Sequence, residues 1–133
     1  MARLAPGRAL EGHRVLLVED AGDIRDLLAL LLRADGAEVR TAGSARAAVE
    51  TAASWDFDVL LTDLGLPDVA GDILIREILG MKHRRPRVIV VTGFGEPYQA
   101  RARAAGAHVV FTKPLDWVEL RKQITVGDES IAA

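Results

Sequence analysis

The sequence predicts a doubly wound α/β fold, in which one parallel sheet carries helices on both faces. Five short runs rich in Val, Ile, Leu and Thr alternate along the chain with segments whose apolar residues recur at helical spacing. Each connection is long enough for a helix, which favours parallel strands joined by right-handed crossovers. The strand order expected for five such units is 2-1-3-4-5, the flavodoxin-like order.

The strand candidates are Val15–Val18, Glu38–Thr41, Val59–Thr62, Val88–Thr92 and Val109–Thr112. The first, third and fourth are nearly continuous Val, Ile and Leu, which is typical of strands buried on both faces. The second carries Glu38 and Arg40, so it suits an edge of the sheet.

The first helix is predicted from apolar residues at helical spacing, Ile24, Leu27, Leu28 and Leu31. Gly36 follows where a left-handed residue commonly ends a helix. Ser44 is the predicted N-cap of an alanine-rich second helix that ends near Trp55. The remaining helices are predicted over Asp72–Met81, Glu96–Ala105, with Pro97 in its first turn, and Asp116–Thr125.

The length of 133 residues predicts one domain over residues 13–126, with an N-terminal tail at 1–12 and a C-terminal tail at 127–133. No run of about 18 apolar residues and no secretory h-region is present, so we expect a cytoplasmic protein with no membrane partner. The absence of Cys excludes disulfides and thiolate zinc sites.

Net charge of −2 provides no electrostatic argument for a nucleic-acid partner. The one dense basic run, Lys82 to Arg87, is interpreted first as a solvated loop and second as a patch for a partner.

Charged and polar residues follow four of the five predicted strands. In open parallel sheets, ligands bind beyond the carboxyl ends of the strands, where the strand order reverses. The residues at these ends are Glu19 and Asp20, Asp63, Thr92 and Gly93, and Lys113 and Pro114. We therefore expect three carboxylates, one hydroxyl and one ammonium to converge on one edge of the sheet.

Three neighbouring carboxylates repel one another and are complemented by a divalent cation. Their hard oxygen ligands favour Mg²⁺, with Mn²⁺ as the alternative. With the metal and Lys113 offsetting negative charge, Asp63 can attack phosphorus and become an aspartyl phosphate. Thr92 and the Gly93 amide are the expected donors to the new oxygens. Taken singly, these residues suit ordinary turns, caps and surface positions, and only their joint placement indicates a site.

The segments Val-Leu-Leu-Val-Glu19-Asp20, Leu-Leu-Thr-Asp63, Val-Val-Thr92-Gly93 and Phe-Thr-Lys113-Pro114 resemble the motifs of response-regulator receiver domains, the CheY-like superfamily of two-component signal transduction. The resemblance covers about residues 13–126. It implies that Asp63 is the phosphoacceptor and that Glu19, Asp20, Asp63 and the Gly65 carbonyl surround Mg²⁺. It further implies that Thr92 is the switch threonine and Lys113 the invariant lysine, joined to Pro114 by a cis bond.

The same resemblance implies the partners. The phosphoryl donor is expected to be a phosphohistidine on a sensor histidine kinase or a histidine phosphotransfer protein, and the output passes through contacts with a downstream protein. Such a domain catalyses its own phosphorylation and autodephosphorylation but does not turn over an external substrate. Gly65 has no side chain to shield the phosphoryl group, which predicts ready access of water.

One position departs from the family pattern. Val110 stands where receivers usually have a Tyr or Phe whose rotamer changes with phosphorylation, and Phe111 should face the opposite side of the sheet. This leaves open a phosphate sink or relay receiver from a hybrid kinase, since no output domain is expected after the fifth helix.

Two other classes are weaker alternatives. A phosphatase of the haloacid dehalogenase type would need an acid two residues after Asp63, where Gly65 stands. A flavodoxin-like binding module that is not phosphorylated would not need the complete set of strand-end residues.

Overall fold

The computed structural model describes residues 8–132, and the side chains of residues 8–126. Within this range five strands and five helices alternate: β1 Arg14–Val18, α1 Gly22–Ala34, β2 Glu38–Ala42, α2 Ala45–Ser54, β3 Val59–Thr62, α3 Gly71–Met81, β4 Arg87–Thr92, α4 Tyr98–Ala105, β5 Val109–Thr112 and α5 Trp117–Ala132.

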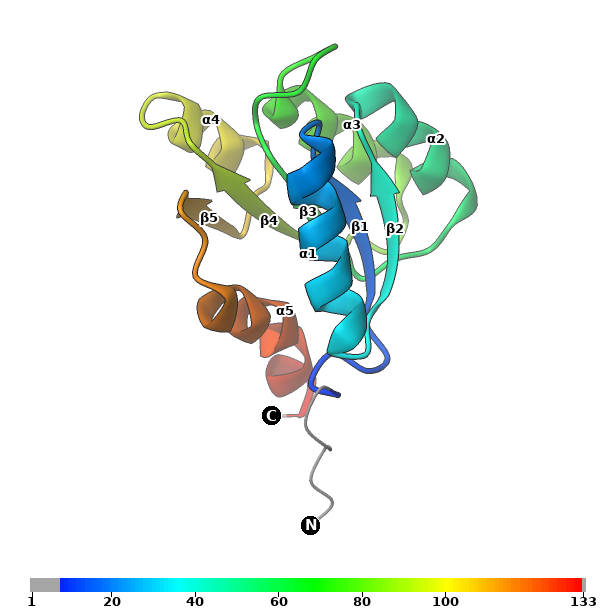
Figure 1. Ribbon diagram of the computed structural model, residues 1–133. Helices are drawn as coiled ribbons and strands as arrows, with labels where there is room; N and C mark the ends of the chain where they lie inside the picture. The colour runs from blue at the N-terminus through cyan, green and yellow to red at the C-terminus, as the bar shows by residue number, and fades with distance from the viewer. Residues whose placement is uncertain (1–7, 133) are drawn as a thin grey trace.

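The strands form one parallel sheet in the order β2-β1-β3-β4-β5. Val15 of β1 pairs with Val39 of β2 on one side and with Val59 of β3 on the other. Helices α1 and α5 lie on one face of the sheet, and α2, α3 and α4 lie on the other (Figure 1). The predicted doubly wound α/β fold and its strand order are therefore confirmed.

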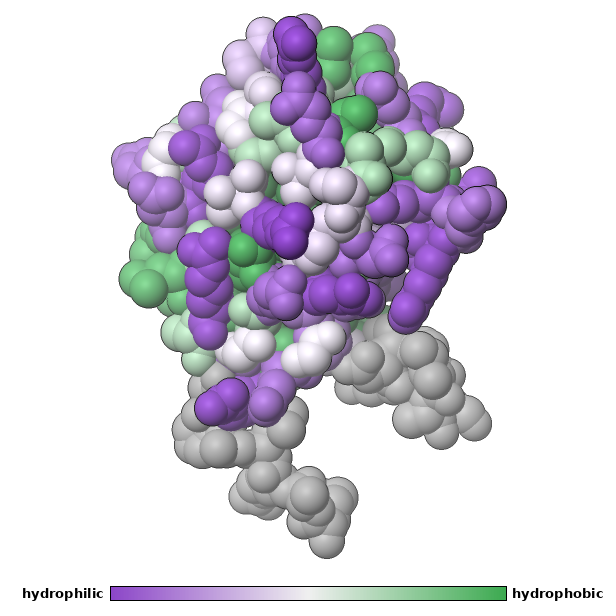
Figure 2. Space-filling view, turned by 90° about the vertical axis from the view of Figure 1, so that its right-hand side faces the viewer, coloured by the Kyte–Doolittle hydropathy of each residue, from purple (hydrophilic) through white to green (hydrophobic). Residues whose placement is uncertain are grey.

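Burial along the strands explains which of them lie in the middle. β1, β3 and β4 are buried over nearly their whole length because helices cover both of their faces. β2 exposes Glu38 and Arg40 and lies at an edge, as predicted. Figure 2 views the molecule from the side of this edge, and the surface there is largely hydrophilic.

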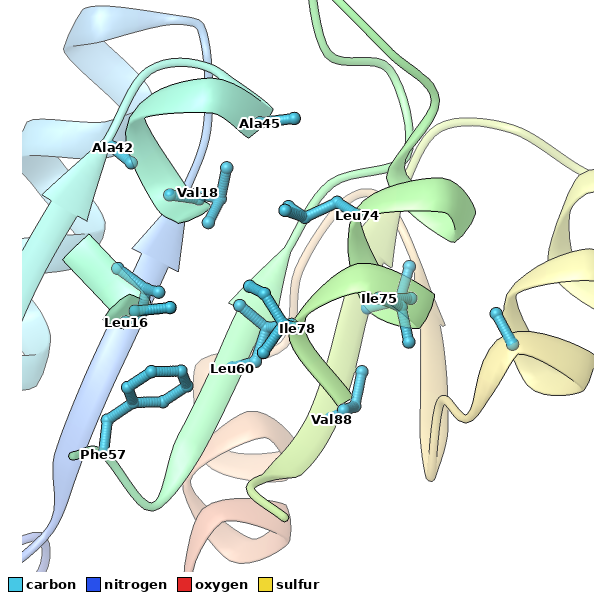
Figure 3. Close-up of a cluster of buried hydrophobic side chains, with 14 of the residues drawn as sticks. Leu16, Val18, Ala42, Ala45, Phe57, Leu60, Leu74, Ile75, Ile78 and Val88 are labelled. Atoms are coloured by element: carbon cyan, nitrogen blue, oxygen red, sulfur yellow. The ribbon is translucent and has the colours of Figure 1, made fainter. Parts of the chain in front are cut away.

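A large hydrophobic cluster fills the space between the sheet and helices α2, α3 and α4 (Figure 3). Its strand side chains meet three fully buried residues of α3, namely Leu74, Ile75 and Ile78. Burial of each such side chain stabilises the fold by about 1.5–3 kcal/mol. This packing fixes α3, and with it the loop between β3 and α3 at the upper end of the sheet in Figure 1.

Gly71, the first residue of α3, lets that helix approach the sheet closely. A Cβ at this position would lie 2.7 Å from the Cα of Leu64 and would also meet the backbone carbonyl of Asp63. Such distances are not tolerated by backbone atoms, so a side chain here would displace the segment that follows β3. The absence of a side chain at Gly71 therefore helps to place Asp63.

Helix ends lie within one residue of the predictions except at the start of α4 and the end of α5. Ser44 caps α2 by accepting a hydrogen bond from the Ala47 amide at 3.1 Å, as expected. α4 begins at Tyr98, two residues later than predicted, and the Glu96 carboxylate accepts from the Ala100 amide at 2.9 Å. α5 continues to Ala132, so most of the predicted C-terminal tail is helical.

The predicted N-terminal tail also contains ordered structure. Leu10 is fully buried in the cluster beneath α1 and α5, and its amide donates to the Asp35 carbonyl at 2.8 Å. Residues 8–12 thus belong to the folded body, while residues 1–7 lie outside the described range. In the part of the chain that the structure describes, no helix is long and apolar enough to cross a membrane.

Candidate functional site

The sheet itself carries three of the predicted site residues to one edge. Hydrogen bonds of the parallel ladder continue just beyond the strands: the Glu19 amide donates to Ala42 O at 3.0 Å, the Asp63 amide to Val18 O at 3.2 Å, and the Lys113 amide to Thr92 O at 2.8 Å. These bonds fix the backbone of each residue where its strand ends. The acidic and basic side chains are therefore held on a rigid frame.

Lys113 joins two of the predicted carboxylates. Its ammonium lies 2.9 Å from Asp63 Oδ2 and 3.2 Å from Glu19 Oε1. The side chains of Glu19 and Asp63 are only 5% and 13% exposed, whereas that of Lys113 is 34% exposed. Lys113 is thus not an independent surface ammonium but the counter-ion of the buried Glu19 and the partly buried Asp63.

The charge of Lys113 is secured by these neighbours. Partial burial by itself would lower the pKa of the ammonium, but the hydrogen bonds and charges of Asp63 and then Glu19 outweigh that effect. The net result is a pKa raised above the usual value of 10.5. Lys113 consequently remains a cation throughout the neutral range.

The other oxygens of the two acids face backbone amides. Asp63 Oδ1 accepts from the Leu64 amide at 2.6 Å and from the Gly65 amide at 3.3 Å. Glu19 Oε2 accepts from the Ala21 amide at 3.3 Å. These bonds orient both carboxylates, so that the oxygen of Asp63 that faces Lys113 is presented in a fixed direction.

Asp20 occupies a different environment from Glu19. Its side chain is exposed, and among the described residues its carboxylate forms no hydrogen bond or ion pair. Arg25, a residue of α1 that sequence reasoning did not assign, donates to Glu19 O at 2.8 Å and reaches Asp20 O at 3.5 Å. It therefore braces the backbone of the acidic pair.

Arg25 reaches this backbone by passing over Gly43 at the end of β2. A Cβ at Gly43 would lie 3.0 Å from Nη1 of Arg25. The guanidinium depends on tertiary geometry that spacing along the chain does not reveal. In the sequence, the role of Arg25 is indicated only by the presence of an Arg in the first turns of the helix that follows the acidic pair.

Thr92 is fully buried, and its hydroxyl oxygen accepts from the Phe94 amide at 3.1 Å. Gly93 lies beside it on the exposed connection to α4. Neither residue forms a hydrogen bond with Asp63 within the described part of the chain. The structure thus brings together Glu19, Asp63 and Lys113 directly, and leaves Thr92 and Gly93 at the neighbouring strand end.

The ring of Phe94 lies over Gly65, a contact not anticipated from the sequence. A Cβ added to Gly65 would lie 3.2 Å from Phe94 Cζ. The space left by the missing side chain of Gly65 is therefore partly filled by an aromatic ring, which itself packs in a tilted arrangement against Tyr98 at 5.1 Å between centroids. This cover opposes the ready access of water predicted from Gly65 alone.

The two faces of β5 are as predicted. Val110 packs toward the cluster under α3 and α4, and Phe111 packs toward the opposite cluster under α1 and α5. The link between β5 and the loop after β4 is instead polar. The Gln99 side-chain amide donates to Phe94 O at 2.8 Å and to Thr112 Oγ1 at 2.9 Å.

The peptide bond between Lys113 and Pro114 is cis, as the family resemblance implied, and the bond between Glu96 and Pro97 is also cis. Beside Lys113 lies a hollow of about 290 Å³ between α1 and the start of α5. Its walls are largely apolar, and Ile24 and Leu27 of α1 are markedly exposed there. The site thus opens next to a hydrophobic surface.

The donor set is suited to a hard divalent cation. The carboxylates of Glu19 and Asp63 are turned to the same ammonium, and Asp20 stands exposed next to Glu19. Among the described side chains no three acids or histidines are placed so that they could hold a metal ion together, so the expected convergence of three carboxylates is not found and only Glu19 and Asp63 meet, at Lys113. Oxygen ligands on one side only fit Mg²⁺, which retains waters and shares phosphate oxygens, better than a cation that needs a full protein shell.

A five-stranded 2-1-3-4-5 sheet with an acidic edge and a lysine between its acids defines the CheY-like class of α/β domains. The family model for the response regulator receiver domain matches residues 15–125. The chain belongs to this family, and it is a receiver domain of two-component signalling.

Curated relatives agree. The chain is 36% identical over 116 residues to the response regulator protein PilR of Pseudomonas aeruginosa, covering 86% of this chain and 26% of that protein. It is 31% identical over 111 residues to the cell cycle response regulator CtrA of Brucella ovis, covering 84% of this chain and 48% of that protein. The chain therefore spans between a quarter and a half of the length of these relatives.

Solved structures agree as well. A CheY-like receiver domain protein from Methanospirillum hungatei superposes with a TM-score of 0.83 at 26% identity, covering 91% of this chain and 95% of that one. The receiver domain of a sensor histidine kinase from Pseudomonas aeruginosa, solved with magnesium in its active-site cleft, has a TM-score of 0.79 at 27% identity, covering 86% and 96%. The regulator TrrA of Thermotoga maritima, in complex with Mg²⁺ and BeF, has a TM-score of 0.77 at 25% identity, covering 86% and 97%.

Proposed function

We propose that this receiver domain accepts a phosphoryl group on Asp63 in a Mg²⁺-dependent reaction. The observation that carries the proposal is the contact of 2.9 Å between Lys113 Nζ and Asp63 Oδ2, made at the end of a buried strand beside Glu19. A carboxylate held in this way presents a nucleophilic oxygen next to a fixed cation. Similar receivers have been solved with magnesium in the corresponding cleft or with a Mg²⁺–BeF complex.

In the proposed transfer, an oxygen of Asp63 attacks the phosphorus of a phosphohistidine. A bond forms between this oxygen and phosphorus, the bond from phosphorus to the imidazole nitrogen breaks, and its electron pair returns to the ring. Lys113 follows the negative charge from the carboxylate to the phosphoryl oxygens. Glu19, Asp20, Asp63 and the Gly65 carbonyl are the proposed ligands of Mg²⁺, which offsets the charge of the phosphoryl oxygens when bound.

The donor is proposed to be a sensor histidine kinase or a histidine phosphotransfer protein acting in the cytoplasm. The exposed apolar residues Ile24 and Leu27 lie at the edge of the hollow beside Lys113, where a protein that delivers phosphate to Asp63 has to dock. A downstream protein partner then responds to the phosphorylated form. The chain catalyses its own phosphorylation and the later hydrolysis of the aspartyl phosphate. Because Phe94 lies over Gly65, it slows the entry of water for this hydrolysis.

The readout is proposed to stay in the loop after β4. In the structure the Thr92 hydroxyl oxygen accepts a hydrogen bond from the Phe94 amide. On phosphorylation the hydroxyl moves toward the phosphoryl oxygens and this hydrogen bond is lost. Gln99 couples that loop to Thr112, so α4 responds with it. Val110 is short and stiff at χ1, and a second candidate function, a phosphate sink or relay, follows if this readout does not occur.

The test is incubation with acetyl phosphate and Mg²⁺, followed by measurement of the intact mass. The wild-type chain is expected to gain the mass of one phosphoryl group, and to gain none when the metal is chelated. Asp63→Asn should gain none, because an amide does not attack phosphorus, and should stay folded because it has nearly the same volume.

The matched control is Asp56→Asn, an equal change of charge on a side chain that is 89% exposed at the other end of the sheet. It should be phosphorylated like the wild type. Full phosphoryl addition to Asp63→Asn would overturn the assignment of the phosphoacceptor.

A further inference from the structure

A second concave site lies at the amino ends of β1, β3 and β4, the opposite end of the sheet from Asp63 and the lower end in Figure 1. The cavity has a volume of about 550 Å³. Three arginines line it: Arg84 and Arg85 of the connection from α3 to β4, and Arg87, the first residue of β4. These residues belong to the basic run of the sequence, which the proposed function does not use.

The positive charge of these arginines is not balanced by the acids beside them. The cavity is also lined by Glu11 and Asp58. Each of these acids already has an arginine from outside the lining: Arg8 lies 3.5 Å from Glu11, and Arg14 Nε lies 3.6 Å from Asp58 Oδ2, which also accepts from the Arg14 amide at 2.9 Å. The cavity therefore has an excess of positive charge in a chain whose net charge is −2.

Only one of the three guanidinium groups is held firmly by protein contacts. Arg87 is held in place by Gln123 of α5, which accepts at its carbonyl at 2.8 Å and at its side-chain oxygen at 2.6 Å. Arg84 is 84% exposed and has one weak contact, 3.9 Å to Asp58. Among the described residues, Arg85 forms no hydrogen bond or ion pair. One fixed cation thus stands beside two that are free to close on an anion.

Besides its charged residues, the cavity lining has an apolar part. Phe57, Val59 and Ile124 contribute to it, and all three are buried in the hydrophobic clusters of the two faces of the sheet. Small-molecule sites commonly have volumes of about 300–1,000 Å³ and combine such apolar walls with a few charged groups. The cavity therefore has the size and the composition of a site for a small organic anion.

We propose that this cavity binds a small ligand that bears a diphosphate group, such as a nucleoside diphosphate. Guanidinium groups pair with phosphate oxygens through two parallel hydrogen bonds, which makes arginine the residue of choice for phosphate. A phosphomonoester carries a charge of about −1.5 to −2 near neutral pH, so two linked phosphates match three arginines better than one does. The apolar wall then accommodates the organic part of the ligand.

The experiment is calorimetric titration of the chain with ADP, with pyrophosphate and with inorganic phosphate, at low ionic strength and with EDTA to keep metal from the site at Asp63. Saturable binding of one ADP or pyrophosphate per chain is expected, with inorganic phosphate weaker. If the affinity for ADP is higher than that for pyrophosphate, the ligand is an organic diphosphate. If the two affinities are equal, the diphosphate group alone is recognised.

The decisive variant is the double substitution Arg84→Ala with Arg85→Ala, since both side chains are exposed and their loss should not affect folding. Affinity for the diphosphate is expected to fall at least about tenfold. The matched control is Arg101→Ala with Arg103→Ala on the exposed surface of α4, which removes the same charge and should change affinity less than about twofold. Arg87 is not substituted because its bonds to Gln123 also hold α5.

Amide chemical shifts locate the ligand independently. Addition of the diphosphate should move the amides of Gly12 and Asp58 in the wild type and leave those of Asp63 and Thr92 unchanged. The proposal is overturned if no diphosphate binds at millimolar concentration, if both double variants weaken binding equally, or if an acidic peptide binds at this cavity and the diphosphates do not.

Discussion

The two ends of the sheet differ in the charged residues with which they bind negative ligands. At the carboxyl ends of the strands, Lys113 contacts two acids, Glu19 and Asp63, and the carboxylate of Asp20 stands exposed next to Glu19. At the amino ends, three arginines face two acids that are already paired with other arginines. A phosphate can be bound at the second end directly, whereas the first end needs an additional cation but offers a carboxylate that can form a bond to phosphorus.

The net charge of −2 hides this contrast, because it averages over both ends. The difference shows that local excess of charge, and not the total, decides which chemistry each end supports. It is also the reason why a metal is proposed at the acidic end only. The following variants are intended to change that contrast, beginning with the largest expected effect.

Lys113→Ala removes the cation that links Glu19 and Asp63 at the carboxyl end. Phosphoryl transfer from acetyl phosphate is expected to slow at least about 100-fold, because a charge aimed at the transferring group is lost. Mg²⁺ affinity should be retained or increased, since the metal then takes the place of the ammonium beside Asp63. Intact-mass time courses and calorimetry measure the two effects.

The control for this variant is Lys122→Ala, an exposed lysine of α5 whose ammonium lies 3.3 Å from Glu119. It should leave both rates and affinities as in the wild type. A parallel loss of transfer and metal binding in Lys113→Ala would mean that the lysine holds the fold of the site and not the charge of the phosphoryl group.

Glu19→Gln and Asp20→Asn separate the two acids that follow β1. The exposed carboxylate of Asp20 is free to bind the metal, whereas that of Glu19 already bonds Lys113 and the Ala21 amide. Asp20→Asn should therefore weaken Mg²⁺ binding by about tenfold or more, and Glu19→Gln by clearly less. Calorimetric titration with Mg²⁺ checks this, and equal losses would show that Glu19 contributes as much as Asp20 to metal binding, contrary to this prediction.

His108→Asn tests the electrostatics of the amino end. Partial burial of the imidazole, and then the positive charge of Arg87, lower the pKa of His108 below its usual value of 6.5. The unfolded chain therefore binds the proton more readily, and stability decreases as the pH falls through 6.5 toward the lower pKa of the folded state. Asn retains the acceptor for the Val88 amide, which donates to His108 Nδ1 at 2.9 Å, but does not titrate.

The variant should consequently lose less stability than the wild type between about pH 7.5 and about pH 5.5 in urea unfolding. His83→Asn, at an exposed position of the basic loop, is the control and should follow the wild type. If His108→Asn and the wild type have the same pH dependence, the histidine does not sense the charge of this end.

The fold and most of the acidic site could be predicted because their signals are local. Continuous apolar runs set β1, β3 and β4, and a parallel sheet necessarily brings Glu19, Asp63 and Lys113 to one edge. The opposite orientations of Val110 and Phe111 follow from strand alternation alone. These features need only the period of the pattern and the order of the strands.

Other features depend on contacts between segments far apart in the sequence. The position of Arg25 over Gly43 requires the end of β2 to lie beside α1, and the cover of Phe94 over Gly65 requires two loops to meet. The burial of Leu10 in a segment expected to be a tail, and the arginine cavity at the amino ends, arise in the same way. Periodicity and strand order carry no information about such pairings.

The most direct test of the proposed function compares amide chemical shifts with and without Mg²⁺ and beryllofluoride, a mimic of the phosphoryl group. We predict large changes at Asp63 to Gly65 and across residues 92–104, with small ones in β5 and none at the amino ends of the strands. No change around Asp63 would contradict the assignment of the phosphoacceptor. Equally large changes across Val109 to Trp117 would contradict the proposal that the readout remains in the loop after β4.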